Sequence, residues 1–241
     1  MAVPFRAVDA DRNQELERVV TLRPYWPRVL SLDIGFAHAS AVIWHATDGE
    51  NVYVYRELVQ AHLTAPELAA EIVKFTPDAE RKAIKAFYVG PDAFSRKTSD
   101  RTQAIELDSA LAPHGFPSLS PAAAGPGDRR LGWLFLYQMF KEGHLKISPK
   151  CPVLVKAIPA AIRDFPDHSE DLLKTETDGD DALDALRYGV YSSSLQPRLP
   201  IELEAARLVT VPMSNLTGRA LQYRDAMQDV RRRRSGLSFG R

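Results

Sequence analysis

The sequence lacks several features that would assign it to a specialised class of protein. Cys151 is its one cysteine, which excludes an intramolecular disulfide and a cysteine-based zinc site and favours a reducing compartment. Its longest nearly apolar run, residues 131–140, is about half the length of a membrane span. The charged N-terminal segment has no apolar core of the kind that a signal peptide needs. We therefore expect a cytoplasmic protein without a membrane partner.

The sequence also lacks a net charge. Thirty-one Lys and Arg residues balance thirty-one Asp and Glu residues, which excludes a globally basic nucleic-acid coat protein but permits local basic patches. Hydrophobic residues make up 45% and charged residues 26% of the 241 residues, as in ordinary globular proteins. A chain of this length and composition can bury a core of its own.

Prolines, apolar runs and charge divide the chain into three regions. Residues 1–27 are a charged lead segment that ends with Pro24 and Pro27, so regular structure is expected to begin after Pro27. Residues 28–195 hold the apolar runs of a folded domain. Residues 196–241 form a basic tail with four consecutive arginines. This tail is either a DNA- or partner-binding arm or a solvated end of the chain.

The first half of the folded region predicts a mixed sheet. Residues 29–35, 39–44 and 52–58 read as three strands joined by short turns, which form an antiparallel meander. A helix follows from Thr64. The apolar run 86–90 comes after that helix and is expected to pair parallel to an earlier strand. The pattern therefore predicts an α/β fold with antiparallel and parallel strands.

The second half reads mainly as helices. Residues 113–127 are a loop rich in proline, glycine, alanine and serine, and residues 145–147 are an edge strand or a loop. The expected helices cover residues 102–111, 128–143, 151–162 and 182–191, and residues 178–181 open the last of them.

Acidic residues stand where strands end and where the last helix begins. Asp33 follows an apolar strand, and Asp92 comes two residues after the strand 86–90. Asp181 and Asp184 are three residues apart and share one face of the last helix, with Asp180 beside them. Since ligands of open α/β sheets bind beyond the carboxyl ends of the strands, these acids are candidates for one site.

Converging carboxylates favour a bound cation. Left alone they repel one another, and Mg²⁺ or Mn²⁺ relieves this because hard cations prefer oxygen ligands. Two such ions can clamp the attacking and leaving oxygens of a phosphoryl transfer, with no protein nucleophile. Each acid alone is also an ordinary turn former or helix cap, so the prediction rests on the set.

Three motifs carry a resemblance to a known family. The segments LDIGFAH at 32–38, YVGPD at 88–92 and DDALDALRYG at 180–189 resemble the nuclease domain of tailed-phage terminase large subunits. The resemblance covers residues 28–195, and the Asp-Ala-Leu-Arg-Tyr string is its most specific part. The segments at 143–147, 151–152 and 158–159 are also similar to that family.

The resemblance implies an RNase H-like fold and metal-dependent cleavage of concatemeric DNA during packaging. It implies that Asp33 and Asp92 are the first two metal-binding and catalytic acids. Many members of the family carry histidine at the position of Asp181, so Asp181 and Asp184 are both assigned to the third position, with Asp180 in reserve. The implied cofactor is Mg²⁺ or Mn²⁺, as two ions.

The resemblance also implies partners. These are double-stranded DNA, a packaging ATPase, the small terminase subunit and the portal, in the cytoplasm of a host cell. The chain has no Gly-x-x-x-x-Gly-Lys-Ser/Thr motif, so the ATPase motor is expected elsewhere, and residues 1–27 are a possible linker remnant. The candidate contacts to DNA phosphates are Lys97, Arg129, Arg130 and Lys174, each of which could equally be solvated surface charge.

Other functions remain open. A Holliday-junction resolvase has the same fold and also places late acids on a helix. A sugar-kinase or actin-like ATPase begins with a similar strand and Asp-x-Gly, but Phe36, Ala37 and His38 replace the glycine and hydroxyl residues that hold phosphates there. A non-catalytic DNA-docking module would keep the fold without cleavage.

Overall fold

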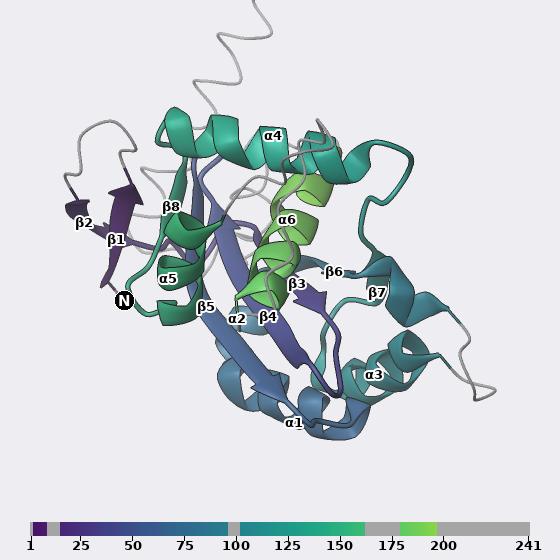
Figure 1. Ribbon diagram of the computed structural model, residues 1–241. Coiled ribbons are helices and arrows are strands. Elements are labelled where there is room, and N and C mark those ends of the chain that lie inside the picture. Colours follow the sequence, from purple (N-terminus) through teal and green to yellow (C-terminus); the bar gives the residue numbers. More distant parts are fainter. Residues whose placement is uncertain (1, 9–14, 96–101, 162–178, 197–241) are drawn as a thin grey trace, which may run out of the picture. The chain divides into compact units, whose positions relative to one another are not determined.

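The computed structural model describes residues 2–8, 15–95, 102–161 and 179–196. These residues form one mixed sheet with helices on both faces (Figure 1). The strands are β1 (Ala2–Val8), β2 (Glu15–Thr21), β3 (Arg28–Asp33), β4 (Ala39–Thr47), β5 (Val52–Ala61), β6 (Ile84–Val89), β7 (Leu119–Pro121) and β8 (Leu145–Ile147). The α-helices are α1 (Ala65–Phe75), α2 (Asp78–Arg81), α3 (Gln103–Leu111), α4 (Asp128–Lys141), α5 (Pro152–Ala160) and α6 (Asp180–Ser194), with 3₁₀ turns η1 (Pro91–Phe94) and η2 (Ala112–His114).

The strand order confirms the predicted fold class. The sheet runs β2-β1-β8-β5-β4-β3-β6-β7. β3, β4 and β5 form the expected antiparallel meander, and β6 pairs parallel to β3. β7 and β8 add parallel pairs with β6 and β5. The carboxyl ends of β3 and β6 therefore lie side by side, which is where the candidate acids follow in the sequence.

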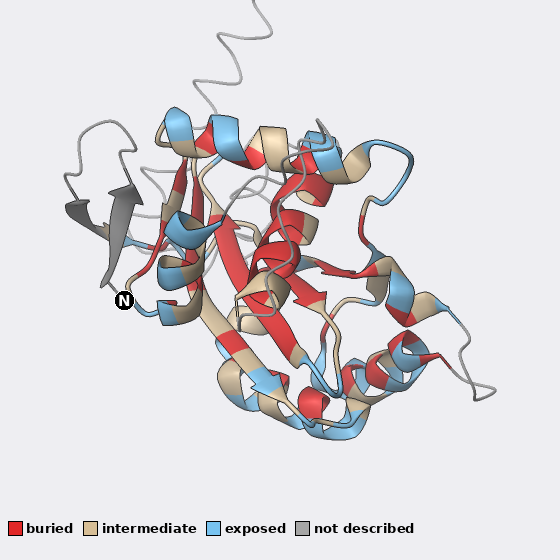
Figure 2. Ribbon diagram, in the orientation of Figure 1, coloured by how far each residue is buried: buried red, intermediate tan, exposed pale blue. Residues whose placement is uncertain are grey.

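Side chains alternate between two apolar layers. Leu30 and Leu32 of β3 pack in the layer under α1 and α3. Ser31, between them, faces the other layer, where α4, α5 and α6 cover the sheet. Figure 2 shows that burial is concentrated in the central strands and in α6. Because α6 is buried along most of its length, its position on the sheet is fixed by packing.

Three sequence expectations about strands are wrong. Regular structure does not begin after Pro27, because β1 and β2 precede it. Residues 145–147 form an interior strand, since β1 pairs with β8 on its outer side. The loop 113–127 contains β7, whose Pro121 fits an edge strand because proline has no N–H to donate. All three depend on pairing between distant segments, which local periodicity does not report.

The expected start of α1 and the expected end of α4 are confirmed, whereas α5 ends at Ala160 and α6 continues to Ser194. Thr64 precedes α1, and the Glu67 carboxylate accepts hydrogen bonds from the Thr64 N–H and hydroxyl at 2.9 and 2.7 Å. Gly143 follows α4 with φ of 74°, a left-handed conformation that favours glycine. Among the described residues, no helix is both long and apolar enough to cross a membrane.

Candidate active site at the carboxyl ends of β3 and β6

Asp33 and Asp92 lie at the same edge of the sheet. Asp33 is the last residue of β3, and the Gly90 N–H at the end of β6 donates to the Leu32 carbonyl at 2.9 Å. A Cβ atom added to Gly90 would lie 3.0 Å from Asp33 Oδ1, so the carboxylate packs directly on this glycine. Asp92 is exposed on η1, two residues further on. The parallel pairing thus brings the first two predicted acids to adjacent strand ends.

Helix α6 carries the third acidic motif to the same place. Gly189 lies so close over β3 that an added Cβ atom would be 2.8 Å from the Cβ of Ser31. Tyr188 contacts the end of β6, because a Cβ atom added to Gly90 would lie 3.1 Å from Cε2 of the Tyr188 ring. Asp184 lies one helical turn before Tyr188, and Asp181 nearly one turn before that.

The pKa of Tyr188 shows that the motif of β3 and the motif of α6 lie close together. Burial raises the pKa of Tyr188 to about 12, and the negative charges of Asp33 and Asp184 contribute to this rise. Two acids from opposite ends of the folded region therefore act on one phenol, which stays protonated at neutral pH. This side chain joins the β3 motif to the α6 motif.

Asp184 is engaged by two arginines. Arg129 Nη1 donates to both of its carboxylate oxygens at 3.2 Å. Arg187 donates to Oδ1 from Nε at 3.2 Å and from Nη2 at 3.1 Å. Arg187 is buried, and its guanidinium lies 4.5 Å from the ring centroid of Tyr188 and 5.5 Å from that of Trp133. The carboxylate is thus part of a packed charge network that connects α4 to α6.

The turn after β3 presents an exposed aromatic side chain, Phe36. The Ser40 hydroxyl accepts from the Gly35 N–H at 3.2 Å and donates to the Gly35 carbonyl at 2.8 Å, which closes the turn. Phe36 is 57% exposed, and its carbonyl accepts from the N–H of His62 at 2.9 Å. His62 has a φ of 61°, which is uncommon for a residue with a side chain.

The structure describes some of the remaining predicted site residues and not others. Lys97 and Lys174 lie outside the described residues. Arg130 is exposed in the first turn of α4, while the neighbouring Arg129 contacts Asp184. Asp180 and Asp181 form the first turn of α6, where a negative charge suits the helix dipole.

Sequence reasoning missed Arg187 and Tyr188 as site residues. Both belong to the Asp-Ala-Leu-Arg-Tyr string, and Arg187 stands three residues after Asp184, which is the spacing of side chains that meet on a helix. That spacing predicts the ion pair within α6. It does not predict Arg129, which comes from another helix.

The candidate acids are of the kind that binds a divalent cation. All of them offer carboxylate oxygens, which hard cations prefer. Within the described ranges, however, no three His, Cys, Asp or Glu side chains are grouped as a metal site. Both carboxylate oxygens of Asp184 accept hydrogen bonds from guanidinium groups.

Comparison with known proteins identifies the fold. No protein-family model matches the sequence, and no curated protein is significantly similar to it. The nuclease domain of the P22 large terminase matches with a TM-score of 0.56 at 20% identity, over 75% of this chain and 88% of that domain. The large terminase of a thermophilic bacteriophage matches with a TM-score of 0.58 at 16% identity, over 81% of this chain and 46% of that one.

A third solved structure agrees with these two. The large terminase nuclease of the thermophilic phage G20c, determined with bound cobalt, matches with a TM-score of 0.50 at 14% identity, over 74% of this chain and 86% of that one. The described part of this chain therefore has the RNase H-like fold of the large terminase nuclease domains.

Proposed function

We propose that this chain is the nuclease part of a large terminase, a divalent-metal-dependent endonuclease that cuts DNA during packaging of a phage genome. One observation carries the proposal. The Asp33 carboxylate packs on Gly90 beside the Asp92 turn, and Tyr188 links it to the acids of α6. Three motifs that are distant in the sequence thus meet at one edge of the sheet. The similarity in fold to terminase nuclease domains supports the same conclusion.

The proposed metal-binding and catalytic residues are Asp33 and Asp92 at the strand ends together with Asp181 and Asp184 of α6. The proposed cation is Mg²⁺ or Mn²⁺, as two ions, because the site offers oxygen ligands. The G20c nuclease, which has this fold, was determined with cobalt bound. A divalent cation, when bound, supplies positive charge for the phosphate and a bound water of lowered pKa.

The proposed partners follow from the packaging role. The substrate is double-stranded DNA in a host cytoplasm, cut without sequence preference. The chain spans less than half of the longer large terminase that it matches, so we propose that the ATPase motor resides in a further segment or polypeptide. The small terminase subunit and the portal complete the set of proposed partners.

Cleavage of supercoiled plasmid tests the proposal. The wild-type protein is expected to nick and linearise the plasmid in Mg²⁺ or Mn²⁺ and not in EDTA. Asp33→Asn removes a proposed metal ligand. Its cleavage rate is therefore expected to fall by more than the roughly 10–100-fold that is lost when a residue hydrogen-bonded to a metal ligand is changed. Its melting temperature should match that of the wild type, because the carboxylate lies at a strand end rather than within the apolar core.

Asp78→Asn is the matched control, since it removes a carboxylate that is 91% exposed on α2, outside the site. Cleavage by Asp33→Asn at the wild-type rate would contradict the proposal. Tight DNA binding without cleavage in any divalent metal would favour a docking module instead. A strong preference for four-way junctions over linear duplex would favour a resolvase.

A further inference from the structure

The turn that follows β3 holds an exposed aromatic residue on a fixed backbone. The Ser40 hydroxyl bonds to both the N–H and the carbonyl of Gly35, at 3.2 and 2.8 Å. A Cβ atom added to Gly35 would lie 2.8 Å from the carbonyl oxygen of His38, so the turn closes tightly on itself. Phe36 comes next, and it is 57% exposed. The turn is therefore well ordered although its largest side chain faces solvent.

A second segment supports the same residue. His62, which directly follows β5, donates its N–H to the Phe36 carbonyl at 2.9 Å. The two rings meet edge to face, with centroids 6.1 Å apart and planes at 79°. His62 takes a φ of 61° in this position, a left-handed conformation that disfavours residues with a side chain. Strain of this kind persists only where the surrounding structure enforces it, and it is concentrated at functional sites.

Exposure alone would not single out Phe36. Scattered exposed apolar side chains are ordinary in folded proteins, and Ile105 and Leu195 are further examples in this chain. Phe36 differs from these two because a residue with a strained backbone packs on its ring. The strain is explained if the ring has to be held in one place for a partner that buries it.

The two rings lie at the edge of the sheet that carries the candidate acids. Ala39 at the start of β4 pairs with Ala61, the last residue of β5. Phe36 and His62 therefore both follow the edge where β3 ends with Asp33. Three residues span at most about 11 Å, which limits the distance between the Cα atoms of Asp33 and Phe36. Phosphates of one DNA strand follow one another every 3.4 Å or so, so this distance covers about three nucleotides.

A phenylalanine ring suits only part of the surface of a DNA duplex. The ring has no hydrogen-bond donor, acceptor or charge, so it neither neutralises a phosphate nor reads the hydrogen-bonding groups of the bases. Apolar side chains contact duplex DNA chiefly in the minor groove, where they wedge against base steps. Such a contact carries little sequence information, which agrees with cleavage that has no sequence preference.

We propose that Phe36 is a DNA-contacting residue whose ring packs into the minor groove within about three nucleotides of the cut, and so positions the duplex at the acids. The inference rests on the proposed nuclease function. His62 is a positioning residue in this arrangement, because it acts on the duplex through the ring of Phe36.

Duplex binding in EDTA tests the contact without cleavage. By anisotropy of a fluorescent duplex, Phe36→Ser is expected to bind about five- to tenfold more weakly than the wild type, the effect of leaving roughly half a phenylalanine side chain in water. The loss should be the same at every salt concentration, because no charge is removed. Phe36→Leu keeps an apolar side chain and should retain most of the affinity. Tyr137→Ser removes an exposed ring from α4, and this control should bind as the wild type does.

The outcomes distinguish this inference from the proposed function. Wild-type affinity in Phe36→Ser would overturn the inference and favour a protein partner for the ring. A changed slope of log K against log salt would also overturn it, since the variant would then disturb phosphate contacts. A wild-type protein that neither binds duplex nor cleaves plasmid would overturn the proposed function instead.

Metal binding separates the contact from a merely structural role of the ring. If Phe36 only supported the turn, Phe36→Ser would disturb Asp33 and weaken the binding of Mn²⁺. Calorimetric titration with Mn²⁺ in the absence of DNA is instead expected to give Phe36→Ser the wild-type affinity. A loss as large as that in Asp33→Asn would overturn the inference. Failure of the wild type to bind Mn²⁺ would overturn the proposed function.

His62 tests the arrangement from the other segment, and it serves also where Phe36→Ser does not fold. His62→Gly removes the ring and suits the left-handed φ, so it should not lower the melting temperature. Its affinity for the duplex is expected to fall about two- to threefold, at the low end of the coupling between residues in contact. In the Phe36→Ser background the same change should have no effect on binding. Wild-type affinity in His62→Gly, or an equal loss in both backgrounds, would overturn the positioning role.

Discussion

At the scale of single residues, Tyr188 connects chemistry to stability. Its ring packs on Gly90, and the negative charges of Asp33 and Asp184 raise the pKa of its hydroxyl. Burial is the largest cause of its raised pKa, and the two acids add to it. The folded protein therefore keeps the proton on Tyr188 to a higher pH than the unfolded chain does.

This difference predicts a loss of stability at high pH. Unfolded tyrosine ionises near its ordinary pKa of 10, whereas Tyr188 in the folded protein holds its proton up to about 12. The stabilising contribution of the hydroxyl is complete below pH 10 and is lost as the pH rises toward 12. Urea unfolding at pH 9 and pH 11 should therefore show that the stability advantage of wild type over Tyr188→Phe shrinks at the higher pH.

Tyr137→Phe is the control for this measurement, because it removes the hydroxyl of a tyrosine that is largely exposed on α4. The prediction fails if the difference between wild type and Tyr188→Phe is the same at both pH values.

At the scale of elements, the contact between α6 and β3 sets the geometry of the site. Gly189 allows the helix to approach the strand closely, because a Cβ atom there would lie 2.8 Å from the Cβ of Ser31 and 2.9 Å from Cε1 of His45. The N-terminal turns of the same helix carry Asp181 and Asp184. A change at this glycine would therefore shift acids that lie one to two turns away.

Gly189→Ala is expected to destabilise the protein by about 1–3 kcal/mol, the usual cost of overpacking a core. The sign of this change in stability tests the close contact, because glycine-to-alanine changes inside exposed helices normally stabilise a protein by about 0.5–1 kcal/mol. Plasmid cleavage should fall as well, since α6 is displaced. Ser31→Gly removes the opposing Cβ atom, so Gly189→Ala should cost less in that background. A full additive cost in the double variant would contradict this account.

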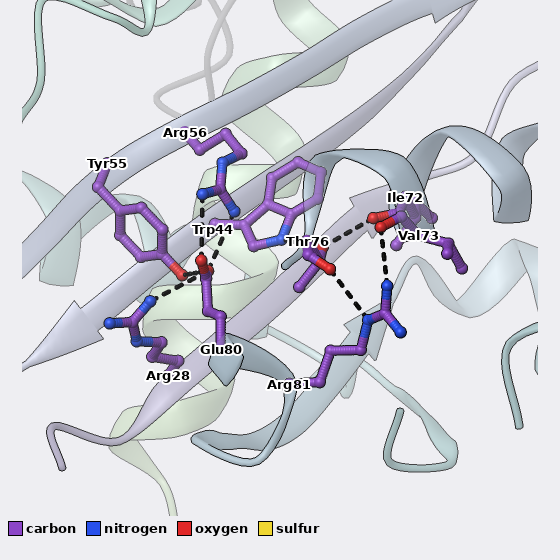
Figure 3. Close-up of polar contacts among 9 residues, drawn as sticks. All are labelled: Arg28, Trp44, Tyr55, Arg56, Ile72, Val73, Thr76, Glu80 and Arg81. Carbon is purple, nitrogen blue, oxygen red and sulfur yellow. Dashed lines mark hydrogen bonds and ion pairs between the residues drawn. The ribbon is translucent and has the colours of Figure 1, made fainter. Parts of the chain in front are cut away.

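At the scale of the whole described fold, a second charge network lies on the other face of the sheet. Glu80 of α2 accepts hydrogen bonds from the Tyr55 hydroxyl and from two nitrogens of Arg56 at 3.0 and 3.1 Å, and it pairs with Arg28 at 3.1 Å (Figure 3). Burial raises the pKa of Tyr55, and the charge of Glu80 raises it further. One carboxylate thus joins α2 to β3 and β5.

Side chains in the same region also form hydrogen bonds with backbone carbonyls at the C-terminal end of α1. The Trp44 Nε1–H donates to the Thr76 hydroxyl at 3.0 Å, and that hydroxyl donates to the Ile72 carbonyl at 2.7 Å. Arg81 donates to the carbonyls of Thr76 and Val73 at 2.9 and 3.1 Å (Figure 3). These contacts satisfy backbone groups that a helix end leaves without partners. Their role is structural, since they lie in the layer of α1 and α2 rather than with the acids under α6.

Glu80→Gln is therefore expected to lower the free energy of unfolding by about 3 kcal/mol, because it leaves two largely buried guanidinium groups without their carboxylate. Cleavage per folded molecule should stay at the wild-type value. Chemical denaturation and plasmid cleavage measure the two effects separately. Asp78→Asn removes an exposed carboxylate from the same short helix, and it is expected to change the free energy of unfolding by no more than about 0.5 kcal/mol. Equal costs for the two variants would contradict the assigned role of Glu80.

Much of the fold follows from local patterns in the sequence. The meander of β3, β4 and β5 was predictable because each strand is an apolar run bounded by a turn. The starts of α1 and α4 followed from Thr64 and Asp128, and the parallel pairing of β6 followed from the helix before it. The division into residues 1–27, 28–195 and 196–241 stays a prediction, as do the roles of the predicted site residues.

The sequence by itself determined which acids stand at strand ends and at a helix start, because burial of apolar side chains sets the limits of those elements. Only the tertiary structure decided what faces those acids. The pairing of Asp184 with Arg129 and the interior place of β8 both join segments that are far apart in the chain. Such contacts depend on how helices and strands pack across the sheet, and a repeat of two or 3.6 residues carries no information about that packing.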